Sequence, residues 1–156
     1  MNSQDFAERV TLIRGKLYKT AVLYMGSHSQ AVDVLDEAVY KALCGLRKLR
    51  SPEYFDTWMT RIVINECHNE LRRRKRCYPV DELPETAAEE FDALPLKEAI
   101  SRLPQELKDI IILRYFSGFT LVETAKLLDI PQGTAATRQK KALKLLRLEL
   151  EEEVTP

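Results

Sequence analysis

A basic segment near the C-terminus carries the residue types that bind DNA. Small and hydroxyl side chains in Gly133–Thr137 precede a run of cations, which are Arg138, Lys140, Lys141, Lys144 and Arg147. Free amides at a helix N-terminus attract phosphate, and side chains on such a helix reach base edges in the major groove. The expected readers of base edges are Thr134, Thr137, Arg138 and Lys141. Lys140 and Lys144 complete the predicted DNA-binding set.

A second segment, Phe55–Arg76, mixes aromatic rings with cations. Nine basic residues lie between Arg47 and Arg76, around Phe55 and Trp58. Bases stack on aromatic rings while cations hold phosphates, so this pattern indicates single-stranded nucleic acid. The alternative is that Phe55 and Trp58 are core residues, since a lone tryptophan is usually buried. The basic run would then only solubilise a helix end.

Helices are the elements that must position both segments. Apolar residues recur at steps of three and four, and no alternating β-branched run is bounded by turn residues. The sequence predicts an all-α fold with helices over residues 6–24, 30–46, 54–74, 96–102, 105–115 and 132–152. One more helix is expected from Thr120 to about Asp129–Pro131.

Several helix starts carry capping signals. Ser27 with Gln30 and Thr120 with Glu123 fit capping boxes, and Ser51 precedes a proline at a first helical position. The helix opened by Thr120 leads through a turn, in which Ile130 is the expected buried plug, into the basic helix. A short capped helix, a turn and a longer basic helix together predict a helix-turn-helix.

The charge pattern predicts two small helical domains joined by an acidic linker. The net charge is +5 over residues 1–78, −6 over 79–95, +5 over 96–148 and −4 over 149–156. The expected domains are therefore 1–78 and 96–152, with the linker at 79–95. The linker is either a solvated tether or a strip that lies in a basic channel of a partner.

Other function classes find little support in the chain. The 156 residues show no apolar run near the 18 needed to span a membrane and no secretory signal. Three cysteines without a framework spacing favour free thiols, so a cytoplasmic location is expected. Cys67, His68 and Cys77 fit no zinc pattern, and no phosphate loop or catalytic triad is evident. We expect no metal, no cofactor, no small-molecule substrate and no enzyme activity.

The two segments, in this order, resemble the sigma-70 family of bacterial RNA polymerase initiation factors, and the length resembles its extracytoplasmic-function (ECF) branch. Residues 33–43 resemble the polymerase-docking helix of region 2, and residues 55–74 its promoter-melting and −10-reading segment. The C-terminal part of the chain resembles region 4, which reads the −35 element. The residues that carry this resemblance are Leu103-Pro104, 112–120, Ala125 and 130–134.

The resemblance implies roles for individual residues. Those expected to bind polymerase are Val32, Asp33, Asp36, Glu37 and Leu43. Those expected to contact −10 DNA are Arg50, Trp58, Arg61, Asn65, Asn69, Arg72 and Arg73. The loop Lys48–Glu53 would help to hold a base flipped out of the non-template strand, which costs a few kcal/mol of stacking. The implied partners are core RNA polymerase, promoter DNA and a membrane-bound anti-sigma factor.

Some positions depart from the family pattern. Ala136 stands where a basic residue is frequent, and Gln139 where an apolar residue is common, so weaker packing is expected at Gln139. Asn69 replaces a common Asp and Ile64 a common Arg. The promoter sequence preference is therefore not carried over. The remaining alternative is a helix-turn-helix regulator with an N-terminal effector domain, which would need neither a docking helix nor a melting segment.

Overall fold

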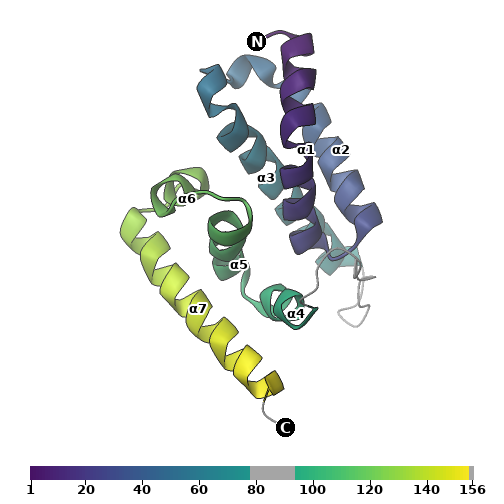
Figure 1. Cartoon of the computed structure of the whole chain (residues 1–156). Coiled ribbons are helices and arrows are strands. Elements are labelled where there is room, and N and C mark those ends of the chain that lie inside the picture. Colours follow the sequence, from purple (N-terminus) through teal and green to yellow (C-terminus); the bar gives the residue numbers. More distant parts are fainter. Residues whose placement is uncertain (78–93, 155–156) are drawn as a thin grey trace. The chain divides into compact units, whose positions relative to one another are not determined.

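The computed structural model describes the backbone of residues 1–77 and 94–154, and side chains over 1–76 and 95–147. The predicted linker, 79–95, lies almost wholly outside the described residues. The chain divides into two compact units, Met1–Thr86 and Ala87–Pro156. Every described element is helical, which confirms the all-α prediction (Figure 1).

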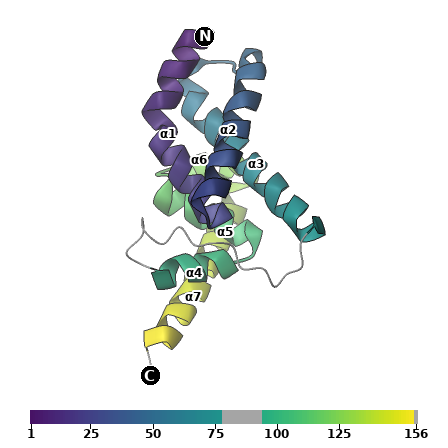
Figure 2. The same cartoon turned by 90° about the vertical axis from the view of Figure 1, so that its right-hand side faces the viewer.

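Three long helices form the N-terminal unit: α1 (Ser3–Met25), α2 (His28–Cys44) and α3 (Phe55–Cys77). Each packs against the other two, as Figures 1 and 2 show. Their buried stripes form one core, whose largest fully buried members include Leu17, Met25, Leu35, Phe55, Met59 and Ile64. Burial of these stripes is the main stabilising term for such a bundle.

The connection between α1 and α2 follows the prediction only in part. Gly26 ends α1 with φ 76°, a left-handed conformation that glycine adopts without strain. Ser27 then caps α2, because its hydroxyl accepts from the amide of Gln30 at 3.2 Å. The reciprocal half of the predicted capping box is wrong, since Oε1 of Gln30 is buried without a hydrogen-bond partner among the described residues.

Two short 3-10 turns, Leu46–Lys48 and Pro52–Tyr54, connect α2 to α3. Ser51 precedes the second turn, as predicted, but its side chain makes no capping hydrogen bond. The α-helix α3 begins at Phe55, one residue after its predicted start.

The C-terminal unit contains α4 (Leu94–Arg102), α5 (Gln105–Ile111), α6 (Leu121–Leu128) and α7 (Gln132–Val154). The helices α4, α5 and α6 all pack against α7. The helix predicted over 105–115 is shorter than expected, because a π-helical turn, Ile112–Phe116, replaces its last turn. There the amide of Ser117 bonds the carbonyl of Ile112 at 2.9 Å, which widens the turn.

Thr120 and Glu123 form the predicted capping box of α6. The Thr120 hydroxyl accepts from the Glu123 amide at 3.1 Å, and the Glu123 carboxylate accepts from the Thr120 amide at 3.0 Å. The latter bond, with the Thr120 hydroxyl second, lowers the pKa of Glu123. The ionised carboxylate thus favours the folded state.

Thr120→Ala should destabilise the C-terminal unit by about 1 kcal/mol, because an alanine leaves the first turn of α6 uncapped. The contribution of the Glu123 charge is present above the ordinary Glu pKa and is lost as the pH falls through the lowered folded pKa. Thermal unfolding followed by far-UV circular dichroism at several pH values measures both effects. Glu123→Gln keeps a capping side chain but should lose less stability on acidification than the natural chain. Equal acid sensitivity of the two would contradict the assignment.

Candidate nucleic-acid interface

A helix-turn-helix occupies residues 120–147 of the C-terminal unit. Asp129 turns the chain after α6 in a left-handed conformation, with φ 57°. The following amide, that of Ile130, bonds the carbonyl of Ala125 at 3.0 Å. Ile130 packs, together with Leu121 and Leu128, on a buried cluster, which consists of Ile110, Ala125 and Ala135. Ile130 thus packs where the plug of the turn was predicted, but it is half-buried and not fully buried.

Gln139 has a hydrogen-bond partner from another element. Its Oε1 accepts from Nε of Arg114 at 3.1 Å, and Nη1 of the same guanidinium donates to the carbonyl of Phe119 at 3.1 Å. Arg114 belongs to the π-helical turn, and its side chain thus links this turn both to α7 and to Phe119, which precedes α6. Gln139 thus has a polar partner on another element, and the expectation of weaker packing at this position stays a prediction.

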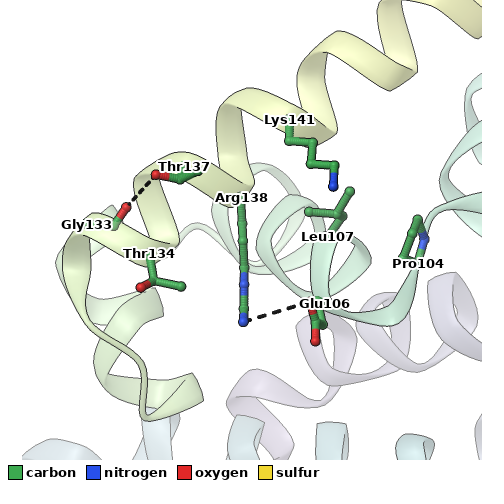
Figure 3. Close-up of a pocket in the computed structure, with 8 residues that line it drawn as sticks. All are labelled: Pro104, Glu106, Leu107, Gly133, Thr134, Thr137, Arg138 and Lys141. Atoms are coloured by element: carbon green, nitrogen blue, oxygen red, sulfur yellow. Dashed lines mark hydrogen bonds and ion pairs between the residues drawn. The ribbon is translucent and has the colours of Figure 1, made fainter.

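The first turns of α7 face a hollow of about 450 Å³ beside the start of α5 (Figure 3). Its walls carry the four predicted readers of base edges, Thr134, Thr137, Arg138 and Lys141. Glu106 of α5 pairs with Arg138, with 3.8 Å between Nη2 and Oε2. Figure 3 shows the Arg138 guanidinium pointing across the hollow toward this carboxylate.

The predicted DNA-binding side chains of α7 differ in their exposure and in their contacts within the protein. Thr137 donates its hydroxyl back to the carbonyl of Gly133 at 3.0 Å. The Arg138 side chain is 29% exposed. Lys140, Lys141 and Lys144 are exposed along the helix. A cationic surface of this kind holds phosphate without strong geometric demands, whereas Arg138 is already held in one direction.

In the N-terminal unit, one face of α3 brings together most of the predicted −10 residues. They recur at steps of three and four, which places them on one side of a helix, and these residues are Trp58, Arg61, Asn65, Asn69 and Arg72. All but Trp58 are exposed. Nη2 of Arg72 donates to Oδ1 of Asn69 at 2.9 Å, so the two side chains form one polar group. Arg50 is exposed in the loop before α3.

Trp58 combines both alternatives that the sequence left open. It is half-buried, and its ring lies 6.1 Å from the ring of the fully buried Phe55. Phe55 also meets Phe6 of α1 edge-on, with 5.8 Å between ring centroids. Phe55 is thus a core residue, while Trp58 is anchored on the core and retains an accessible part.

Arg73 lies apart from this face, toward α2. It makes two hydrogen bonds with the Glu70 carboxylate, at 2.6 and 3.0 Å, which lower the pKa of Glu70. Together with Asp33 and Glu37 the pair lines a hollow of about 340 Å³ between α2 and α3. One residue of displacement along a helix rotates a side chain by about 100°, which separates Arg73 from Arg72.

The predicted polymerase-binding residues lie along α2. Asp33, Asp36 and Glu37 are exposed, and Val32 is half-buried. Leu43 is 42% exposed and lies off the buried stripe of α2. Two ion pairs tie α2 to its neighbours, Asp36 with Arg14 at 3.3 Å and Lys41 with Glu66 at 2.7 Å. The bond to Glu66 raises the pKa of Lys41.

Two family models match this chain, one in each unit. Residues 10–77 match the family model "Sigma-70 region 2", and residues 99–148 match "Sigma-70, region 4". The RNA polymerase sigma factor SigV of Bacillus subtilis is 31% identical over 141 residues, covering 87% of this chain and 85% of that protein. The chain belongs to the sigma-70 family.

Further relatives place this sigma factor in the ECF branch. The ECF RNA polymerase sigma factor SigW of Bacillus subtilis is 26% identical, over 93% of this chain and 88% of that protein. The protein is accordingly a transcription initiation factor that recognises promoters with RNA polymerase.

Two solved structures share the fold of this sigma factor. The sigma factor RpoE, in complex with the anti-sigma factor NepR from Bartonella quintana, has a TM-score of 0.82 at 22% identity, covering 98% of this chain and 99% of that chain. CnrH, in complex with the cytosolic domain of CnrY, has a TM-score of 0.76 at 19% identity, covering 97% and 90%.

The described residues add two negative findings. None of the helices over 1–77 and 94–154 is long and apolar enough to cross a membrane. Among the described side chains, those of residues 1–76 and 95–147, no three His, Cys, Asp or Glu gather as metal ligands. Cys44 and Cys67 form no disulfide among the described residues, and the side chain of Cys77 lies outside them.

Sequence reasoning missed three residues near these sites. Tyr40 is 63% exposed on α2, three residues after Glu37 and three before Leu43, so helical spacing alone could have found it. Glu106 and Arg9 belong to elements remote from those they contact, Arg138 and Pro52. No local pattern in the sequence reveals such pairs.

Glu106→Gln should strengthen duplex binding by the sigma factor with core polymerase, because it removes the anion that holds Arg138. We expect a two- to threefold gain in affinity, and a plot of log K against log salt that is steeper by up to about 0.9. Anisotropy titrations at several salt concentrations measure both. The matched control is Glu98→Gln, which makes the same charge change but frees only Arg102 of α4. Equal effects of the two variants would show a general charge effect instead.

Proposed function

We propose that this sigma factor reads the −35 element with α7, contacts the −10 element with α3 and the preceding loop, and binds core polymerase through α2. In this proposal the −35 residues are Thr134, Thr137, Arg138, Lys140, Lys141 and Lys144. The observation that carries the −10 assignment is the shared face of α3, on which aromatic, amide and cationic side chains lie together.

The proposed −10 set is Arg50, Trp58, Arg61, Asn65, Asn69, Arg72 and Arg73. Trp58 and Arg61 lie by the upstream edge of the bubble, and the loop Lys48–Glu53 helps to hold one flipped base. In this proposal Arg73 breaks its hydrogen bonds with the Glu70 carboxylate and binds a DNA phosphate instead. This exchange favours DNA only where the phosphate replaces both hydrogen bonds of the carboxylate.

The proposed polymerase-binding set is Val32, Asp33, Asp36, Glu37 and Leu43. Its acidic members lie at exposed positions on α2, and Leu43 adds an exposed apolar contact. An interface of this kind joins an apolar centre to a charged rim that sets orientation. The protein needs no cofactor and catalyses no reaction itself, because polymerase performs the chemistry.

Its proposed inhibitor is a membrane-bound anti-sigma factor, which would cover the polymerase-docking faces of both domains in the cytoplasm. This part rests on likeness to sigma factors solved with NepR and with the cytosolic domain of CnrY. The proposal also includes the domain limits 1–78 and 96–152. The acidic linker between them, 79–95, would lead toward the channels of the polymerase.

Run-off transcription tests the proposal. Bacterial core polymerase is given a genomic fragment library with and without the purified protein. Discrete new start sites, preceded by shared elements at −10 and −35 spacing, are the expected result. Absence of start sites, together with binding of a specific duplex by the protein alone, would instead indicate a stand-alone helix-turn-helix regulator.

A further inference from the structure

The loop between α2 and α3 has few bonds of its own. Its two turns are closed by backbone hydrogen bonds, from Leu49 to Leu46 at 3.2 Å and from Tyr54 to Ser51 at 3.1 Å. These bonds shape each turn locally but do not fix the loop against the helices around it. Arg50, at its centre, is exposed.

Arg9 of α1 supplies a link from outside the loop. Its Nη1 donates to the carbonyl oxygen of Pro52 at 2.7 Å, across 43 residues of sequence. The same guanidinium lies 5.9 Å from the centre of the Phe55 ring. A charged donor makes a short and strong hydrogen bond, and a guanidinium over a ring adds a cation–π attraction.

Through Phe55 the link reaches Trp58. The Phe55 ring contacts Trp58 on one side and Phe6 of α1 on another. Arg9 therefore touches both the loop and the aromatic group that begins α3. These are the two parts assigned above to the flipped base and to the upstream edge of the bubble.

We propose that Arg9 is a positioning residue, which holds the loop Lys48–Glu53 against Phe55 in the geometry that receives one unpaired −10 base. This inference rests on the proposed function of α3 and the loop. Flipping a base costs stacking energy, and ordering a loose loop at the same moment adds a further cost. A loop that is fixed beforehand avoids the second cost and keeps its base preference.

The test compares Arg9→Ala and Arg9→Lys with the natural chain, each with core polymerase. Templates are promoters from the run-off library, in pools that carry all four bases at every −10 position. Sequencing of the transcripts gives the base preference at each position. Lys16→Ala is the matched control, since it removes one exposed cation from the same helix.

For Arg9→Ala we expect discrimination to fall roughly tenfold at one −10 position, that of the captured base, and less than about twofold elsewhere. Arg9→Lys should show an intermediate loss, because an ammonium can donate to the Pro52 carbonyl but cannot stack on the ring. Lys16→Ala should match the natural chain. Arg9 is exposed, so both variants should fold with nearly unchanged melting temperatures.

Two results would overturn the inference while leaving the proposed function intact. One is an unchanged base preference in Arg9→Ala. The other is an equal loss at every −10 position, which would assign Arg9 a general structural role. If the natural chain itself yields no discrete start sites, the proposed function is the part that is wrong.

Discussion

Phe55→Ala is expected to unfold the N-terminal unit at temperatures where the natural chain is folded. Phe55 is 1% exposed and lies between Phe6 and Trp58, so its removal leaves a cavity at the junction of α1 and α3. Truncation of a buried phenylalanine costs about 3–5 kcal/mol. For a unit of this size that corresponds to a fall in melting temperature of roughly 12–40 °C.

The single tryptophan makes this measurement specific. Trp58 lies in the N-terminal unit, so its fluorescence follows that unit during heating. The neighbouring Tyr54, which is 64% exposed, provides the control. Tyr54→Ala should change the free energy of unfolding by less than about 0.5 kcal/mol. Similar losses for the two variants would contradict the position of Phe55 in the core.

Replacement of Lys140, Lys141 and Lys144 by alanine should lower the affinity of the holoenzyme for its promoter duplex by about two orders of magnitude. Each exposed lysine of α7 that neutralises a phosphate releases a counterion, so three losses reduce the salt slope by about 2.7. Anisotropy titrations across a range of salt concentrations, on a duplex from the run-off library, measure the affinity and the slope.

The matched control replaces the same three lysines by arginine. The charges remain, so the salt slope should stay near that of the natural chain even if the exact contacts change. Both triple variants alter only exposed positions and should melt like the natural chain. An unaltered slope in the alanine variant would exclude α7 as the phosphate-binding helix.

Local signals predicted most of the fold. Thr120 and Glu123 carry a capping box in sequence and in structure, and Leu103-Pro104 separates two helices as expected. These features depend on residues within four positions of each other, which a chain expresses wherever it folds. Two local predictions failed: residues 112–116 form a π-helical turn, in which Arg114 bonds Gln139 of α7, and the reciprocal bond of Gln30 is not made.

In the candidate site, too, some features could be predicted from the sequence and others could not. The sequence determined which helices are cationic, their caps and the helix-turn-helix, because charge and periodicity are properties of neighbouring residues. Helical spacing already separates Arg73 from Arg72 and allows its i,i+3 pair with Glu70, and only the position of that pair beside α2 came from the tertiary structure. The tertiary structure added the contacts between distant segments. It alone joined Arg9 to Pro52, Arg138 to Glu106 and Gln139 to Arg114. Such pairs arise when the packing of apolar faces brings distant segments together, and no spacing along the chain encodes them.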